Sequence, residues 1–350
     1  MNFPKEIKIA IQKAKNEDFF TYKWLDYCKK YSIDFILVDA YSNDIIEQVQ
    51  GCDLFLWHYS NYDYRDQVFA KQLLFSLETS GIVVFPDFKT SWHFDDKLGQ
   101  KYLLEAIQAP VIPTFVFYDK KSALDWANST SFPKVFKLRK GSGSNNVILL
   151  KSKYEAKKYI QRAFGSGFPF YNQKASFFDR IIRHKRKGKF LLGLFKSLYR
   201  MFDVPDNLKF VSNEIGYVYF QDFIENDGFD IRVVVIGEIA FALKRFVRKG
   251  DFRASGSGYI IYDQKEINID CIKIAFQVNE SLKMQTVAYD FIISNVDGKP
   301  YIGEISFGYA ATAYSACTGY WDRSLNFHEG KFEFQEVLFK QLIYSNNLRD

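Results

Sequence analysis

The chain has 350 residues, of which 47% are hydrophobic and 25% charged, a balance that excludes a disordered protein. This length exceeds what one ordinary hydrophobic core holds, so we expect two or three domains. The net charge of +6 has a local source, because residues 180–200 contain eight Lys or Arg and no Asp or Glu. The rest of the chain is slightly acidic, so we expect no nucleic-acid partner.

Targeting signals and cysteine patterns are missing from the sequence. The first residues lack a charged-then-apolar secretory pattern, and no apolar run reaches the roughly 20 residues that cross a bilayer. The cysteines are far apart, with neither zinc-site nor disulfide-framework spacing (Cys28, Cys52, Cys271 and Cys317). These features predict a cytoplasmic protein.

The first ninety residues alternate short apolar runs with helical stretches such as 63–80. The runs at 7–11, 35–38, 54–57 and 82–85 are nearly continuous in hydrophobicity, as strands of a buried parallel sheet are. No Gly-x-Gly-x-x-Gly follows the first run, so dinucleotide binding there is unsupported. We predict a small α/β domain.

A glycine- and serine-rich loop follows in the next part of the chain. After a predicted helix at 98–108, strands at 133–138 and 147–150 flank the loop Gly141, Ser142, Gly143 and Ser144. A strand–loop–strand hairpin differs from a Walker P-loop, so we expect the backbone N–H groups of this flap to cover phosphates. A helix is predicted at 151–164, and residues 165–212 have the character of an insertion.

The last part of the chain is rich in predicted strands. They cover 217–224, 231–236, 239–246, 287–293 and 301–306, with helices at 265–282 and 333–344. Asp290 and Glu304 each interrupt an apolar strand, and the strands are joined by the turn at 295–300. A carboxylate there needs a partner or a metal, so two facing each other across a hairpin indicate Mg²⁺. The alternative is a pair of core carboxylates salt-bridged to Arg232 or Arg245.

Three basic residues precede or accompany these strands. Lys137 stands before the Gly/Ser loop, where it would contact a phosphate, although an exposed lysine beside a hairpin turn is an equal alternative. Arg232 and Arg253 would supply guanidinium groups for charge on a phosphate oxygen. Each arginine taken alone also suits a structural or surface role.

Taken in order, these residues resemble the ATP-grasp superfamily, and within it the RimK-like carboxylate–amine ligases. The resemblance covers about 91–345 and is carried by 137–147, 221–224, 230–232, 251–255, 290 and 304–306. It implies an α/β ATP-grasp fold with an N-terminal Rossmann-like domain at 1–92. A linker and lid would follow at 93–225, and a catalytic subdomain at 226–350.

The resemblance also implies roles for individual residues. Phosphates would be bound by Lys97, Lys137, Gly141, Ser142, Gly143, Ser144, Arg253, Ala254 and Ser255, with Arg232 and Arg253 catalytic. The adenine and ribose of ATP would meet Gln221, Asp222, Phe223, Ile224 and Asp230, and Mg²⁺ would meet Asp290, Glu304 and Ser306. A substrate carboxylate would attack the γ-phosphate, and an amine would displace phosphate from the resulting acyl phosphate.

The chain departs from the family pattern beside the metal residues. Ser306 stands where Asn is expected, and Phe307-Gly308-Tyr309 replaces the usual Pro-Gly. A second Mg²⁺ would then bind through water or less tightly, and the acceptor pocket would differ. A small-molecule or sugar kinase and a silent nucleotide-binding regulatory protein are the alternatives to a ligase.

Two segments suggest the acceptor. The aromatic stretch 309–330 follows the strand with Glu304 and would line a binding site for a sugar or planar metabolite, with a structural loop as the alternative. Its His328 suits either a catalytic base or a structural role. The basic segment 180–200 suits an anionic membrane surface or a polyanionic carrier, and equally a solvated helix on the lid. We therefore expect a glycan or lipid-linked sugar in cell-surface polysaccharide biosynthesis, with peripheral contact at the inner face of the membrane.

Overall fold

The computed structural model describes residues 7–14, 19–141, 146–169, 212–247, 253 and 259–344. All structural statements concern these residues. Ser142, Gly143, Ser144, Ala254, Ser255 and the basic segment 180–200 lie outside them, so their predicted roles are not addressed by the fold.

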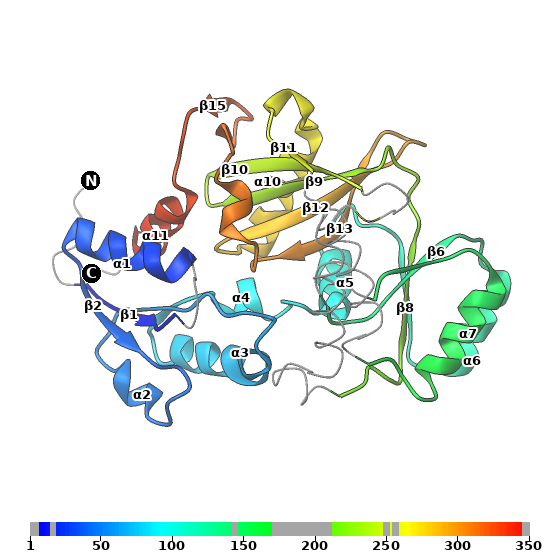
Figure 1. Ribbon diagram of the computed structural model, residues 1–350, viewed down its shortest axis with the longest axis horizontal. Helices are drawn as coiled ribbons and strands as arrows, with labels where there is room; N and C mark the ends of the chain where they lie inside the picture. Colours follow the sequence, from blue (N-terminus) through cyan, green and yellow to red (C-terminus); the bar gives the residue numbers. More distant parts are fainter. Residues whose placement is uncertain are drawn as a thin grey trace, which may run out of the picture.

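The N-terminal part is a four-stranded parallel sheet, as predicted. Its strands are β1 (Lys8–Gln12), β2 (Asp34–Val38), β3 (Leu54–Leu56) and β4 (Val83–Phe85), in the order β2-β1-β3-β4. The intervening helices are α1 (Phe19–Tyr31), α2 (Ile45–Gln48) and α3 (Tyr64–Thr79), and the short α4 (Phe88–Ser91) follows β4. Strands β1 and β3 are largely buried because helices cover the sheet (Figure 1), whereas the edge strand β2 is partly exposed, as at Leu37.

A second sheet of four antiparallel strands lies at the far end of the molecule (Figure 1). It contains β5 (Thr114–Phe117), β8 (Val218–Asp222), β6 (Lys134–Lys137) and β7 (Ile148–Leu150), in that order. Helices α6 (Lys120–Ser129) and α7 (Lys153–Ala163) pack on it around Phe136 and Phe220. The strand–loop–strand hairpin predicted around the Gly/Ser loop is therefore confirmed by the pairing of β6 with β7.

The third and largest sheet is built from the C-terminal strands. Its main path is β13-β12-β9-β10-β14-β15, and β11 (Ile260–Ile261) also pairs with β10. The strands span β9 (Phe229–Ile236), β10 (Ile239–Phe246), β12 (Val287–Ile293), β13 (Pro300–Ser306), β14 (Gly319–Asp322) and β15 (Phe327–Glu329).

The helices around this sheet lie where they were predicted, except that the first turn of α10 is missing. Helix α10 (Ile269–Leu282) begins later than predicted, because the Asn268 side chain caps it by accepting a hydrogen bond from the Asp270 N–H. The preceding Gln264–Glu266 forms only a 3₁₀ turn. Helix α11 (Phe334–Tyr344) ends the described chain, and α5 (Lys97–Ala106) begins beside the Gly/Ser loop.

Alternation along β9 joins the first and third sheets into one body. Val233 and Val235 face α10, whereas Val234 and Ile236 join the core that contains the N-terminal sheet. Helix α11 contributes to the same core, and the Tyr27 hydroxyl of α1 donates at 2.7 Å to Glu333, the residue before α11. The first and third sheets therefore share one hydrophobic core.

No helix among the described residues is long and apolar enough to span a membrane. All four cysteines are buried thiols. The strands of each sheet fall within one of the ranges 1–92, 93–225 and 226–350, and the division of the chain into domains at those boundaries stays a prediction.

Candidate functional site

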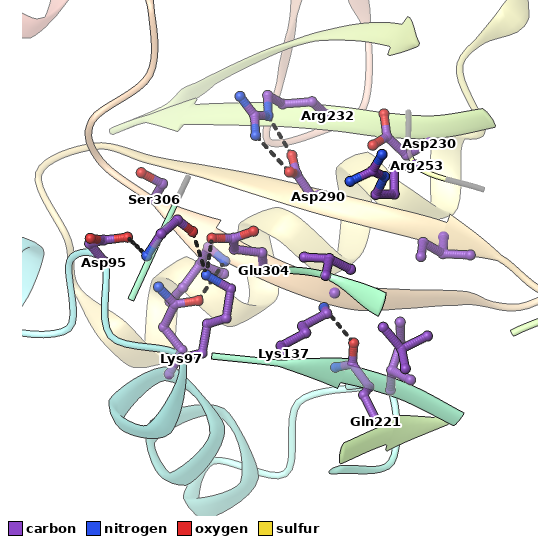
Figure 2. A pocket seen from close by; sticks show the side chains of 18 of the residues that line it. Asp95, Lys97, Lys137, Gln221, Asp230, Arg232, Arg253, Asp290, Glu304 and Ser306 are labelled. Atoms are coloured by element: carbon purple, nitrogen blue, oxygen red, sulfur yellow. Dashed lines mark hydrogen bonds and ion pairs between the residues drawn. The ribbon is translucent and has the colours of Figure 1, made fainter. Parts of the chain in front are cut away.

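A cavity of about 370 Å³ lies between the second and third sheets and is bordered by the start of α5 (Figure 2). The described residues predicted for nucleotide, metal or catalysis all line it. They are Lys97, Lys137, Gly141, Gln221, Asp222, Phe223, Ile224, Asp230, Arg232, Arg253, Asp290, Glu304 and Ser306.

The two strand carboxylates face each other because of a bulge. At the turn end of the β12–β13 hairpin, Ile293 pairs with Pro300, and continuing that register would place Asp290 opposite Gly303. A register shift between Asp290 and Phe291 instead pairs Asp290 with Glu304. Since a one-residue slip reverses the face on which a side chain lies, this bulge brings both carboxylates to the cavity side.

Asp290 is bound by two arginines, as in the salt-bridged alternative. Arg232 Nε and Nη2 donate to its two oxygens, the second at 2.6 Å, and Arg245 Nη2 lies 3.1 Å from Oδ2. Arg245 also donates twice to Asp230, each time at 2.7 Å. Burial raises the pKa of Asp290, but the two guanidinium groups outweigh it and hold that pKa well below its usual range.

Glu304 is the more accessible of the two carboxylates. Its side chain is 36% exposed, and its nearest cation is Lys97 Nζ at 3.5 Å from Oε1. Ser306, two residues along the same strand, accepts a hydrogen bond from the Gly308 N–H at 3.1 Å.

These oxygens fit Mg²⁺ only in part. Glu304 and the Ser306 hydroxyl are hard oxygen donors on the cavity wall, as Mg²⁺ requires. Asp290 is already neutralised by guanidinium groups, and the described residues contain no group of three or more His, Cys, Asp or Glu able to hold a metal. The donor set therefore suits a cation that also takes ligands from a phosphate chain.

Lys137 is held at the cavity by a chain of hydrogen bonds from β8 and β5. Its ammonium donates to Gln221 Oε1 at 2.6 Å, and Gln221 Nε2 donates to Thr114 Oγ1 at 3.2 Å. Burial lowers the pKa of Lys137 to about 8, although Glu304 nearby opposes the shift. Lys137 therefore lines the cavity and is not the exposed lysine of the alternative interpretation, and its contact with a phosphate stays a prediction.

The first residue of the Gly/Ser loop, Gly141, is held through both of its backbone polar groups. Lys97 Nζ donates to the Gly141 carbonyl at 2.8 Å, and the Gly141 N–H donates to Asp95 Oδ1 at 2.9 Å. Burial raises the pKa of Asp95. Asp95 was missed from sequence because nothing in its spacing distinguishes it from the neighbouring Asp96, which caps α5.

A second cavity, of about 550 Å³, adjoins the first. Both are lined by Asn61, Tyr62, Phe94, Gly308 and Ala310. Of the aromatic stretch 309–330, only Tyr309 and Ala310 line either cavity. His328 instead contacts Asp322 at 2.7 Å on the β14–β15 ribbon, so its prediction as a base at the acceptor site is not supported and its structural alternative fits.

Comparison with known proteins identifies the fold. Residues 201–312 match the model of the RimK-like ATP-grasp domain. The D-alanyl-alanine synthetase A from Vibrio cholerae superposes with a TM-score of 0.59 at 12% identity, covering 99% of this chain and 100% of the synthetase. The D-alanine–D-alanine ligase from Bacillus anthracis gives 0.55 at 13%, covering 97% and 99%.

A RimK-domain ATP-grasp protein from Sphaerobacter thermophilus gives a TM-score of 0.52 at 14% identity, covering 87% of this chain and 93% of that protein. No curated protein has significant sequence similarity to the chain. At these identities the structural likeness establishes the fold, and the substrates are a separate question.

Proposed function

Since the chain has the ATP-grasp fold, with a RimK-like ATP-grasp domain at 201–312, we propose that it is an ATP- and Mg²⁺-dependent carboxylate–amine ligase. The observation that carries this proposal is the convergence of Lys97, Lys137, Arg232, Arg253 and Glu304 on one cavity. Cations that neutralise a phosphate chain, next to an accessible carboxylate, are the requirements for phosphoryl transfer from a Mg²⁺-bound nucleotide.

The nucleotide lies along the cavity between the second and third sheets in this proposal. Gln221 to Ile224, at the end of β8, line the adenine end, and Asp230 lies beside the ribose. Lys97 and Lys137 contact phosphates, together with the loop 141–144 and the segment 253–255. On binding, the Lys97 ammonium would exchange the neutral Gly141 carbonyl for a charged phosphate oxygen, because hydrogen bonds between ionised groups are stronger.

The magnesium ligands of the proposal are Glu304, Ser306 and Asp290. Mg²⁺, when bound, neutralises charge on the phosphate oxygens and fixes their position. Glu304 is the principal ligand, since Arg232 and Arg245 already occupy Asp290. Ser306 contributes through its hydroxyl oxygen or through water.

Two displacements make up the reaction. A substrate carboxylate oxygen forms a bond to the γ-phosphorus as the bond to the β–γ bridging oxygen breaks, giving an acyl phosphate and ADP. The substrate amine then attacks the acyl carbon, phosphate leaves, and the amine loses a proton as the amide forms. Arg232 and Arg253 stabilise the negative charge on the phosphoryl and acyl oxygens.

A kinase is the second candidate function. Ser306 and the Phe307-Gly308-Tyr309 sequence change the wall next to the metal residues, where the second displacement would occur. A hydroxyl substrate placed there would accept the phosphoryl group and keep it. The third candidate, a nucleotide-binding regulatory protein without catalytic activity, would bind ATP and not turn it over.

One experiment separates these candidates. The protein is incubated with Mg-ATP and pools of carboxylic acids and amines, and ADP and free phosphate are measured separately. A ligase releases both in equal amounts, and only when an acid and an amine are both present. ADP without free phosphate would replace the ligase with the kinase, and nucleotide binding without ADP release would favour the regulatory protein.

The cellular setting proposed here is cell-surface polysaccharide biosynthesis at the inner face of the membrane, with a glycan or lipid-linked sugar as acceptor. Its support is the eight basic residues among apolar ones in 180–200. Deletion of 180–200 is expected to reduce cosedimentation with vesicles rich in anionic lipid. Equal cosedimentation of the deleted and full chains would contradict the membrane contact.

A further inference from the structure

The second cavity lies at the carboxyl edge of the N-terminal parallel sheet. It is lined by Gln12 and Lys13 at the end of β1, and by Trp57 and His58 directly after β3. In open α/β sheets, ligands bind outside the carboxyl ends of the strands, where loops diverge and side chains converge. The position of this cavity therefore suits a ligand.

A ligand in this cavity reaches the nucleotide cavity. Tyr62, which is 67% exposed, and Asn61 line both spaces from the N-terminal side, and Gly308 lines both from the loop that follows the strand with Glu304. The junction is narrow at Gly308, since an added Cβ would clash with the Phe94 ring. A group that passes Tyr62 arrives beside the residues proposed to handle the acyl phosphate.

Aromatic rings form much of the cavity wall. Tyr41, Trp57 and Tyr59 form one cluster, with the Trp57 ring centroid 6.1 Å from that of Tyr41 and 5.8 Å from that of Tyr59. Tyr62 and Tyr309 add further rings. Such walls favour a ligand with a ring or flat apolar face.

The carboxylates of the cavity are already engaged. Asp66 accepts hydrogen bonds from the Tyr41 hydroxyl and, at 2.8 Å, from the Ser60 N–H. Asp63 pairs with Arg65, whose Nη2 lies 2.8 Å from Oδ2. A cationic group on a ligand would have to displace these partners.

Lys13 differs from these carboxylates in its contacts. Its ammonium makes no hydrogen bond or ion pair with the part of the chain that the structure describes, and it is the one Lys or Arg among the described residues that line the second cavity. It does not line the nucleotide cavity. An anionic group held there is remote from ATP and is not the group that reacts.

We propose that the second cavity binds the amine substrate, and that this substrate is a ring-bearing amine with an anionic group. Lys13 holds the anion, the aromatic walls hold the ring, and the amine points past Tyr62 toward the acyl phosphate. The assignment of the amine rests on the proposed ligase function, whereas the binding site and its preference for an anion do not.

4-(Aminomethyl)benzoate and benzylamine are matched probes, since both carry a ring and an amine and only the first carries a carboxylate, on the side of the ring opposite the amine. Binding of each is measured calorimetrically in the presence of a non-hydrolysable ATP analogue. The wild-type protein is expected to bind 4-(aminomethyl)benzoate about tenfold more tightly than benzylamine, because benzylamine lacks the charge-assisted hydrogen bond to Lys13. Lys13→Gln is expected to bring the ratio close to one, and Tyr62→Ala to weaken both probes.

Matched controls lie on exposed positions of α1. Lys29→Gln makes the same charge change, Tyr22→Ala removes an exposed ring, and neither residue lines a cavity. Both are expected to bind the probes as the wild type does. Binding of neither probe, equal binding of the two by the wild type, or an unchanged ratio in Lys13→Gln would overturn the inference.

Failure of the ligase proposal gives a different result. In that case no acid and amine pair yields ADP, while the affinity ratio between 4-(aminomethyl)benzoate and benzylamine and its dependence on Lys13 persist. A ligase that turns over, but whose amine substrate has an unchanged KM in Lys13→Gln and Tyr62→Ala, retains the proposed function and loses the second-cavity site.

Discussion

Replacing Asp290 with Asn tests whether this carboxylate holds the arginines or only a metal. The substitution keeps the shape of the side chain and removes its charge. In the protein, Asp290 is 16% exposed, accepts twice from Arg232, and lies 3.1 Å from Arg245. Without it, Arg245 keeps Asp230 as a carboxylate partner, whereas the guanidinium group of Arg232 loses the carboxylate that it contacts.

The expected cost follows from the burial of this cluster. Removal of one member of a buried ion pair costs about 3–5 kcal/mol, because the other charge stays buried without compensation. The Asn oxygen still accepts one hydrogen bond, so we expect a loss near the lower limit, about 3 kcal/mol. For a chain of this size, each kcal/mol lowers the melting temperature by about 2 °C, which gives a decrease of about 6 °C.

The assay is thermal unfolding in EDTA, so that no divalent cation contributes. Asp297→Asn, on the turn between β12 and β13, is the matched control, and we expect its melting temperature to equal that of the wild type. If Asp290 served only a metal, removing its charge would leave the metal-free protein unchanged or more stable. A melting temperature of Asp290→Asn at or above the wild type would therefore refute the reasoning.

Three further predictions concern the nucleotide cavity and its border. Glu304→Gln is expected to abolish ADP release. Its melting temperature should stay within about 2 °C of the wild type, since the Glu304 side chain is partly exposed. Undiminished ADP release would contradict the role of Glu304 as a metal ligand. Because the pKa of Lys137 is lowered to about 8, its ammonium is present below that pH and lost above it. The dissociation constant of a non-hydrolysable ATP analogue, measured by calorimetry, should therefore be constant from pH 6.5 to 7.5 and rise about tenfold per pH unit above 8. Lys137→Arg should remove the rise. A constant dissociation constant up to pH 9.5 in the wild type would contradict the contact between Lys137 and a phosphate. Gly308→Ala is expected to lower the melting temperature and raise the KM of the amine, because the added Cβ would clash with the Phe94 ring. Adding Phe94→Leu should reverse part of both effects. If the double variant had the same melting temperature and KM as Gly308→Ala, this clash would not be the cause.

The sequence predicts the hairpin that carries Asp290 and Glu304, but not why both carboxylates share a face. Two apolar strands and a short turn with Asp297-Gly298 are enough to predict antiparallel pairing. The register depends on a bulge between Asp290 and Phe291, and no local pattern marks its place. The prediction that they face each other was confirmed, although the simple register from the turn would have placed them on opposite faces.

The arginine cluster lies beyond sequence reasoning for a similar reason. Arg232 stands opposite Asp290 on the neighbouring strand, and Asp230 stands opposite Arg245 on the next. Both pairs result from the register of three strands whose residues are 15 to 58 positions apart. The sequence suggested Arg232 or Arg245 as alternative partners of Asp290, and the structure shows that both bind it at once.

The two cavities depend on different parts of the chain, and this separates nucleotide binding from acceptor choice. Lys137, Gln221 and Glu304 are fixed by hydrogen bonds and strand pairing within the second and third sheets. The second cavity, which Lys13 lines, lies beside the nucleotide cavity because the N-terminal sheet packs against the face of β9 that carries Val234 and Ile236. Hydrophobic periodicity predicts each sheet but not how the sheets pack against each other, so the second cavity could not be predicted from the sequence. It follows that substitutions at Lys13 should change which amine is used while leaving the affinity for ATP in place.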